Sequence, residues 1–322
     1  CSKLLPSRVL TQYVGMKALC VVYHSVSDNA LPHLDFLYQV RSAKQFEKDL
    51  DFYLKHYTPV DITEFISYSK KQKNKPFFHL TFDDGLREFL DIVSPILLRR
   101  GIPATCFVNS AFIDNKDMFF RLKASLLMHF IKEQSLVKNA IDWAKSLHYD
   151  IPDIFDFIAT INYQNKNKLD LLASYLSYNF DDYLKEKEPY LTTMQIKTLK
   201  DKGFTFGSHS IDHPLFANIE EDEQVRQTIE STERIIEITD LQKRYFAFPF
   251  TDDGVKMSFF SKISRSVDCC FGSAGMKKDD SAINIQRLPI EINKLDANEI
   301  VKTEILAYGI KCLCGKNKVK RQ

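Results

Sequence analysis

The sequence predicts an α/β protein in which short buried strands alternate with amphipathic helices. Three apolar runs rich in β-forming residues carry this prediction, at 18–23, 77–82 and 103–108. Segments with apolar residues at helical spacing separate such runs, so we expect parallel strand pairing through right-handed crossovers. Polar side chains directly follow the first two runs. In α/β folds, this end of the strands is where ligands bind.

Helices are expected between the strands, and two of them begin with a capping box. Ser42 and Gln45 begin a helix over 41–57, and Thr192 and Gln195 begin one over 191–202. Further segments with helical spacing complete the α/β pattern. These helices are expected at 63–69, 88–100, 220–239 and 296–312, and the last strands at 268–271 and 284–288.

The composition is that of an ordinary globular chain: of 322 residues, 44% are hydrophobic and 27% are charged. This length suits one large α/β domain or two small ones. A net charge of +2 gives no electrostatic reason to expect a nucleic-acid partner. No stretch of the sequence reaches the roughly 20 apolar residues of a transmembrane segment. The oligomeric state stays open.

The seven cysteines form an odd set without paired spacing, at positions 1, 20, 106, 269, 270, 312 and 314. Cys20 and Cys106 fall within apolar runs and are expected to be buried thiols. This usage favours a reducing compartment such as the cytoplasm. Because the chain begins with Cys1 rather than Met, an exported form trimmed of a signal peptide, or one anchored by a lipid-modified cysteine, stays open.

The strand expected at 77–82 ends in two adjacent carboxylates and a glycine, in the stretch FFHLTFDDG. Neighbouring strand residues point in different directions, so Asp83 and Asp84 are suited to two different jobs. One could hold a metal while the other faces a water. Gly85 supplies the backbone freedom that a sharp exit requires. A solvated Asp-Asp-Gly turn is the alternative for these three residues taken alone.

A second polar stretch, GSHSIDHP at 207–214, follows another strand-like run at 204–206. His209 and His213 lie four residues apart, so on one helical turn their imidazoles would share a face. Two histidines and a carboxylate make a three-ligand site with an open position, which is typical of a catalytic metal. A chance histidine pair is the alternative. The order of a strand-end TFDDG followed by a strand-end HSxxH is much more specific.

TFDDG (81–85) and HSIDH (209–213) resemble the first two motifs of the polysaccharide deacetylases, carbohydrate esterase family 4. The resemblance extends over most of the chain, from about residue 18 to residue 290. It implies a distorted (β/α) barrel with fewer than eight strands. It also implies a metal-dependent hydrolase that removes N-acetyl groups from an amino sugar in a glycan or polysaccharide.

By the same resemblance, Asp83 would be the general base of the reaction. The metal ligands would be Asp84, His209 and His213. Two nitrogens and one oxygen favour zinc and also suit cobalt, iron or nickel. The cofactor is therefore expected to be a divalent metal, and the partner an N-acetylated carbohydrate.

The general acid is expected at the first strand. Most members of the family carry this histidine on the last strand of the catalytic domain, but no histidine follows His213 here. In a circularly permuted branch, which includes the biofilm poly-N-acetylglucosamine deacetylases, the first strand ends in Tyr-His. VVYH (21–24) resembles that strand, so His24 would be the acid. A lone histidine in this position is otherwise most often a satisfied core or loop residue.

The stretch YFAFPFTDDG (245–254) resembles the third family motif, in which a backbone N–H after a Pro-aromatic turn stabilises the oxyanion. Phe250 would supply that N–H. Ala247 stands where many members have an arginine, which puts the orienting role of that arginine in doubt. The second Asp-Asp-Gly, at 252–254, is expected to be only a loop. Arg287 and Glu291 are further candidates to face the site.

Residues 109–189 are too many for a plain connection, and their apolar residues recur at threes and fours. We expect a helical insertion at about 112–189 that packs on the barrel, either as a lid over its mouth or as an oligomer contact. The expected organisation is an N-terminal extension (1–17), a polysaccharide deacetylase-like catalytic domain (18–311) and a basic tail (312–322). The tail is expected to be solvated, as terminal charge runs usually are.

Three functions agree with these motifs. They are a de-N-acetylase acting on a glycan, a hydrolase of the same fold acting on another amide or on an O-acetyl ester, and a non-catalytic carbohydrate-binding relative. The intact ligand set and Asp83 argue against the third. Fold alone does not separate the first two.

Overall fold

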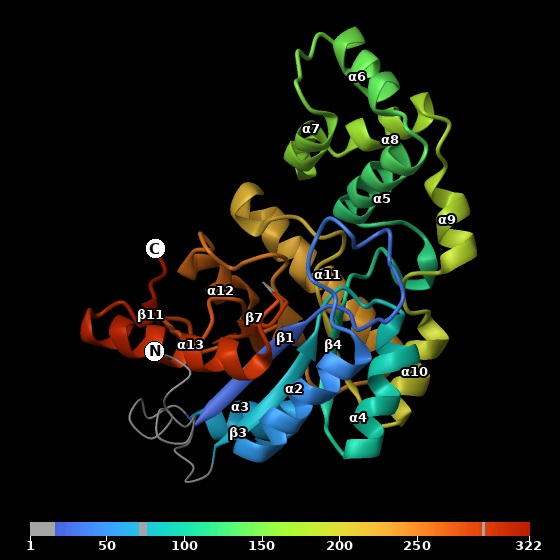
Figure 1. The fold of residues 1–322 in the computed structure, drawn as a ribbon. Coiled ribbons are helices and arrows are strands. Elements are labelled where there is room, and N and C mark those ends of the chain that lie inside the picture. Colours follow the sequence, from blue (N-terminus) through green and yellow to red (C-terminus); the bar gives the residue numbers. More distant parts are fainter. Residues whose placement is uncertain (1–16, 71–75, 292–293) are drawn as a thin grey trace.

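The centre of the molecule is a nearly closed barrel of parallel strands (Figure 1). The computed structural model describes residues 17–70, 76–291 and 294–322. Along the hydrogen-bonded path the strands follow in the order β10-β1-β3-β4-β5-β6-β7-β9, and β2 pairs with β3 off this path. Their bounds are β1 (Ala18–Tyr23), β2 (Thr58–Pro59), β3 (Phe77–Phe82), β4 (Ala104–Val108), β5 (Thr205–Ser208), β6 (Tyr245–Ala247), β7 (Cys269–Gly272), β9 (Asn284–Gln286) and β10 (Leu288–Pro289).

The expected distorted (β/α) barrel is confirmed. Its path has eight strands, where fewer than eight were expected, because one extended segment supplies two of them. β9 pairs with β7 and β10 pairs with β1, and only Arg287 stands between β9 and β10 in the sequence. The one unsealed seam of the barrel therefore lies at Arg287. Counted as a single interrupted strand, this segment makes the barrel seven strands around.

Helices surround the barrel (Figure 1). They are α2 (Ala43–His56), α3 (Ile62–Lys70), α4 (Ser94–Arg100), α10 (Thr193–Asp201), α11 (Glu221–Thr239), α12 (Met257–Ile263) and α13 (Ala297–Leu313), with a π-helical turn η2 (Phe89–Val93) before α4 and short 3-10 turns η3 (Ile113–Asn115), η4 (Tyr163–Asn165) and η5 (Phe216–Asn218). Both expected capping boxes are confirmed: the Ser42–Gln45 pair precedes α2, and the Thr192–Gln195 pair precedes α10.

Alternate residues of each strand enter two different cores. Val21 and Leu80 belong to a cluster with the surrounding helices, whereas Cys20, Phe77 and Phe107 belong to a second cluster inside the barrel. This is the two-residue side-chain period of a strand with both faces buried. Phe65 of α3 packs edge-on against Phe77, the first residue of β3, so α3 covers the end of the barrel where the strands begin. The opposite end of the barrel, where the strands finish, is the end at which ligands bind in α/β folds.

The expected helical insertion is confirmed, and it forms a lobe beside the barrel (Figure 1). Its helices are α5 (Phe120–Glu133), α6 (Val137–Ser146), α7 (Ile154–Thr160), α8 (Asn167–Tyr175) and α9 (Phe180–Lys187). The lobe has a hydrophobic core of its own, in which Leu127, Ile131 and Leu172 are fully buried. Leu34, from the loop that follows β1, is buried in this core as well.

The basic tail is not wholly solvated. β11 (Lys318–Val319) pairs with β8 (Lys278–Asp279), and the Arg321 side chain is buried in ion pairs with Asp252 and Asp279. Asp252 also accepts hydrogen bonds from Asn284 and Gln286. The expectation of a solvated tail is therefore wrong at Arg321, whose cation is buried against Asp252. Residues 252–254 form a loop as expected, but one with a buried, ion-paired carboxylate. None of the helices in the described residues combines the length and hydropathy needed to cross a membrane.

Candidate active site

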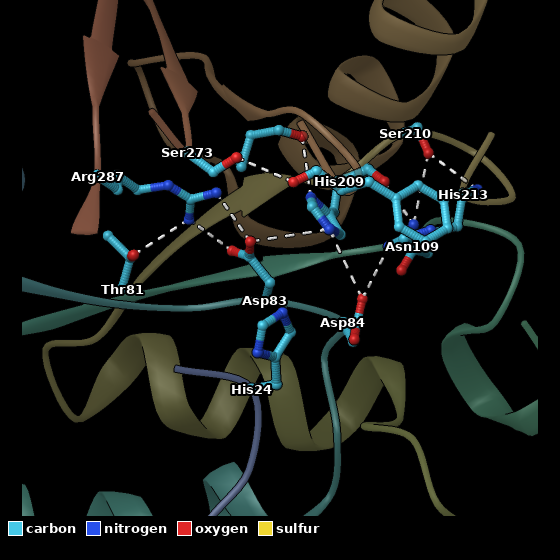
Figure 2. A network of polar contacts seen from close by, with 12 residues as sticks. His24, Thr81, Asp83, Asp84, Asn109, His209, Ser210, His213, Ser273 and Arg287 are labelled. Atoms are coloured by element: carbon cyan, nitrogen blue, oxygen red, sulfur yellow. Dashed lines mark hydrogen bonds and ion pairs between the residues drawn. The ribbon is translucent and has the colours of Figure 1, made fainter. Parts of the chain in front are cut away.

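The polar residues singled out by the sequence meet at the end of the barrel where the strands finish (Figure 2). Asp83 and Asp84 directly follow β3, and His209 directly follows β5, two strands away. The chain leaves β3 through two residues of left-handed backbone, Asp84 (φ 71°) and Gly85 (φ 66°). A Cβ atom on Gly85 would lie 2.5 Å from the Val108 Cγ1 atom, so only glycine fits this close approach.

Three of these side chains form a buried cluster that could hold a metal ion. The Asp84 Oδ1 atom lies 3.2 Å from His213 Nε2 and 3.6 Å from His209 Nε2. One ligand atom from each residue lies within 4.8 Å of the other two. Among the described residues, the buried Asp84 Oδ1 atom has no hydrogen-bond partner. A buried, unpartnered carboxylate oxygen facing two imidazoles is consistent with a divalent metal site.

The two histidines converge through a turn and not through a helix, so the expectation of a shared helical face is wrong. Residues 209–213 form a loop in which Ser210 (φ 71°) and His213 (φ 64°) have left-handed backbone. The Ser210 hydroxyl accepts a hydrogen bond of 3.0 Å from the His213 backbone N–H. Gln227 of α11 accepts a second one, of 2.9 Å, from the Ile211 N–H. The polar partners of this turn bring the two rings together.

The electrostatic surroundings suit metal ligands. Burial lowers the pKa of His209 to about 4, so its imidazole is neutral at physiological pH, as metal binding requires. The hydrogen bond between His209 Nδ1 and the Ala247 carbonyl, 2.9 Å long, leaves Nε2 free. Burial opposes ionisation of Asp84, but His213 and the other nearby imidazoles hold the pKa of its carboxyl well below the usual range.

Asp83 lies beside the Asp-His-His cluster and is bound by the guanidinium of Arg287. Arg287 binds its two carboxylate oxygens with two hydrogen bonds, of 2.7 and 2.8 Å, and donates a third, of 3.1 Å, to the Thr81 hydroxyl (Figure 2). Burial alone would raise the pKa of Asp83, but the Arg287 charge lowers it below its ordinary value. Asp83 is therefore an ionised, oriented carboxylate. The arginine that orients Asp83 comes from the barrel seam and not from the third motif, where Ala247 stands.

His24 lies at the end of β1, next to β3, and has a buried carboxylate as its partner. Its Nδ1 atom lies 2.6 Å from Glu291 Oε2, and the same carboxylate accepts hydrogen bonds from the backbone N–H groups of His24 and Ser25. Partial burial favours the neutral imidazole, but the hydrogen bond and charge of Glu291 outweigh it and raise the pKa of His24 to about 9. His24 and Glu291 border a cavity of about 500 Å³.

Phe250 lies beside the metal-binding cluster, just after β6. Its backbone is left-handed (φ 57°), and its half-exposed ring packs edge-on against His213, with 4.6 Å between the ring centroids. Phe119 of the helical insertion packs on the same imidazole, with 3.9 Å between the centroids. Two aromatic rings thus fix the orientation of His213.

A sequence model of the family described as polysaccharide deacetylase matches residues 70–258, more than half of the chain. The chain belongs to the polysaccharide deacetylase family. A search of curated proteins gave no match.

Solved structures of deacetylases share the fold of this family member. IcaB from Ammonifex degensii has a TM-score of 0.57 at 15% sequence identity, covering 90% of this chain and 97% of that chain. A de-N-acetylase from Aggregatibacter actinomycetemcomitans also has a TM-score of 0.57 at 15% identity, covering 89% of this chain and 99% of that chain. The Streptococcus pyogenes deacetylase PplD in complex with acetate has a TM-score of 0.56 at 13% sequence identity, covering 89% of this chain and 98% of that chain. At these identities the likeness concerns the fold alone.

The polysaccharide deacetylase fold brings all the candidate residues to one end of the barrel, and it adds two partners that the sequence left undecided. Arg287 binds Asp83, and Glu291 binds His24. Both come from the segment around β10, which pairs with β1. The only signal for them in the sequence was a pair of charges at the last predicted strand. This topology, with His24 on the first barrel strand, agrees with the circularly permuted branch of the family.

Proposed function

We propose that this protein is a metal-dependent hydrolase that removes N-acetyl groups from an amino sugar in a glycan. The observation that carries the proposal is the convergence of an Asp-His-His cluster, an ionised carboxylate and a protonated imidazole on one end of the barrel (Figure 2). Membership of the polysaccharide deacetylase family supports it, as does the shared fold with solved deacetylases.

Asp84, His209 and His213 would hold the metal, and this donor set favours zinc. A bound divalent cation would polarise the acetyl carbonyl and lower the pKa of a coordinated water. The three ligands come from two strand ends that the barrel fixes in place, so the site needs no large rearrangement to form. Its burial keeps bulk water from competing with the substrate.

Asp83 and His24 would handle the protons. Asp83, ionised and oriented by Arg287, takes a proton from the attacking water. His24, kept protonated by Glu291, gives a proton to the departing nitrogen. Each such transfer typically contributes about 10²–10⁴ in rate. An amine is a more basic leaving group than an alcohol, so a strongly protonated acid at this position favours an N-acetyl substrate over an O-acetyl ester.

Phe250 would contribute its backbone N–H to the oxyanion that develops on the acetyl carbonyl. Its left-handed backbone beside His213 supports this role. The loss of one oxyanion donor typically costs about 3 kcal/mol of transition-state stabilisation. The catalytic domain that holds these groups would span residues 18–311, with the helical insertion as part of it.

Acetate release from matched N-acetylated and O-acetylated oligosaccharides, with and without a chelator, tests the proposal. We expect release from the N-acetylated set, its loss with chelator and its recovery on adding zinc. Asp83→Asn should lower kcat by at least about a hundredfold and leave metal binding intact. Release only from the O-acetylated set would assign the protein as an esterase. Binding without release from any sugar would make it a carbohydrate-binding relative.

A further inference from the structure

Tyr38 contacts both His24, the proposed acid, and Asp84, a proposed metal ligand. Its ring stacks on the His24 imidazole, with 4.4 Å between the centroids and 23° between the planes. Its hydroxyl donates a hydrogen bond of 3.4 Å to Asp84 Oδ2, the carboxylate oxygen that does not face the two histidines. Tyr38 also borders the cavity at His24.

The loop that carries Tyr38 is held mainly by the helical insertion; on the barrel side, the Gln39 N–H donates a hydrogen bond of 3.5 Å to the Glu291 carbonyl, just after β10. The Ser125 hydroxyl of α5 donates to the Pro32 carbonyl at 2.8 Å and accepts from the Phe36 N–H at 3.3 Å. His129 of the same helix pairs with Asp35 at 3.1 Å. The core of the insertion includes Leu34, fully buried, and packs against residues 37, 38 and 40. The segment 31–40 is therefore part of the insertion in packing terms.

We infer that Tyr38 is a positioning residue, and that the helical insertion serves to hold it against His24 and Asp84. The hydroxyl restrains the second oxygen of Asp84, so that Oδ1 stays aimed at the two imidazoles. The ring of Tyr38 covers one face of the His24 imidazole, which restrains rotation of the imidazole and favours its cationic form. The inference rests on the metal centre and the acid of the proposed function, and it goes beyond them by giving the insertion a role.

The two contacts can be separated by two substitutions. Tyr38→Phe removes the hydroxyl and keeps the ring, whereas Tyr38→Leu removes both. Outer partners of metal ligands are typically worth 10–100-fold in metal affinity. Because the hydrogen bond to Asp84 is long, we expect the lower end of this range, a rise of about tenfold in the zinc Kd of Tyr38→Phe. The Kd is measured on the metal-free full chain by competition with a chromogenic zinc chelator.

The ring contact has its own readout. NMR titration of the His24 ring in the metal-free protein should show a lower midpoint for Tyr38→Leu than for the parent, and an unchanged midpoint for Tyr38→Phe. Tyr175, an exposed tyrosine of α8, gives matched controls, since Tyr175→Phe and Tyr175→Leu should change neither the Kd nor the titration. Equal zinc Kd values for Tyr38→Phe and the parent, or equal His24 midpoints for Tyr38→Leu and the parent, would overturn the positioning role.

The bracing role of the insertion is tested by Ser125→Ala, which leaves the site itself intact. We expect the zinc Kd to rise by a smaller factor than for Tyr38→Phe, and the double variant to be no weaker than Tyr38→Phe alone. Additive effects would overturn the coupling between the insertion and Tyr38. A parent chain that binds no zinc would overturn the proposed function together with this inference, whereas a parent that binds zinc but is insensitive to Tyr38 would overturn this inference alone.

Discussion

At the scale of single residues, the two groups proposed to move protons each face a buried partner of opposite charge. Arg287 holds Asp83 as a carboxylate, and Glu291 holds His24 as an imidazolium. Opposite partners drive the two pKa values apart, so that a base and an acid coexist at neutral pH. Substituting Glu291 or Arg287 should therefore shift one limb of the pH profile of kcat/KM while His24 and Asp83 themselves stay unchanged.

Glu291→Gln should shift the basic limb of the kcat/KM profile to lower pH. In the proposed mechanism the active form of His24 is the protonated one, so activity should fall as the pH rises through its pKa, which Glu291 raises from 6.5 to about 9. Without the carboxylate that pKa moves back toward its ordinary value, and activity at pH 8 drops far more than at pH 6. A bound cation lowers the value in parent and variant alike, so the shift is the quantity to measure. Glu188→Gln, in an exposed ion pair with Arg87, is the control; a basic limb that stays in place would contradict the pairing.

Arg287→Met should destabilise the fold and shift the acidic limb of the kcat/KM profile to higher pH. It leaves Asp83 as an unpaired buried carboxylate, a change that typically costs about 3–5 kcal/mol. Arg287 holds the folded pKa of Asp83 below its ordinary 3.8, so this stabilisation exists above that pH and is lost on acidification. The difference in unfolding free energy between parent and variant should accordingly narrow below about pH 4. Urea unfolding across pH measures it, with the exposed Arg99→Met as control; a constant difference would argue against the ion pair as its source.

At the scale of elements, the turn after β3 decides where the side chain of Asp84, a candidate metal ligand, points. Asp84 and Gly85 are both left-handed, and β4 passes so close that Val108 leaves no space for a Cβ atom at Gly85. The turn is therefore fixed from two sides, by its own dihedral angles and by the neighbouring strand. The position of Asp84 depends on this packing more than on its own hydrogen bonds.

Gly85→Ala should cost clearly more stability than Gly101→Ala and should weaken zinc binding. Both glycines have left-handed backbone, with φ of 66° and 62°, so both substitutions carry about 1–2 kcal/mol of strain. Only at Gly85 does the added Cβ collide with another strand, because nothing lies within 4 Å of one at Gly101. Denaturant unfolding and the zinc Kd compare the two variants. Equal stability losses, or an unchanged Kd for Gly85→Ala, would contradict this account of the turn.

Elements and local motifs could be read from the sequence because their signals lie within a few residues. The capping boxes, the strand that ends in Asp83 and Asp84, and the spacing of the two histidines are all of this kind. The conformation of the histidine motif was not predictable. A four-residue spacing fits one helical turn, but here Ser210 and Gln227 supply hydrogen bonds to a tight turn instead, and Gln227 lies on a helix that follows later in the chain.

At the scale of the whole molecule, the site is assembled from both ends of the barrel sequence. Arg287 meets Asp83 across 204 positions, and Glu291 meets His24 across 267. Such pairings leave no periodicity or spacing in a single sequence, so the two partners could be named only as charged residues near a predicted strand. Closure of the barrel at β10 makes these contacts, and the position of the unsealed seam at Arg287 became visible only with the complete strand order.

Metal binding should stabilise the entire chain, because its ligands tie residue 84 to residues 209 and 213 across β4. A ligand present at a hundred times its Kd adds about 2.7 kcal/mol to the unfolding free energy. For a chain of this size we expect a rise in Tm of about 5 °C, reversed by a chelator. His209→Ala and His213→Ala should abolish the rise, and the exposed His148→Ala should keep it. A rise that persists in the ligand variants would place the metal elsewhere.

The contact between His24 and Glu291 also has a consequence for synthesis. His24 leaves the ribosome 267 residues ahead of its carboxylate partner, and β1 waits equally long for β10, its neighbour on one side. A growing chain thus displays the proposed proton donor long before Glu291 can pair with it. If the proposed function holds, activity toward sugars should require β10 to dock, and chains released before that step should be inert.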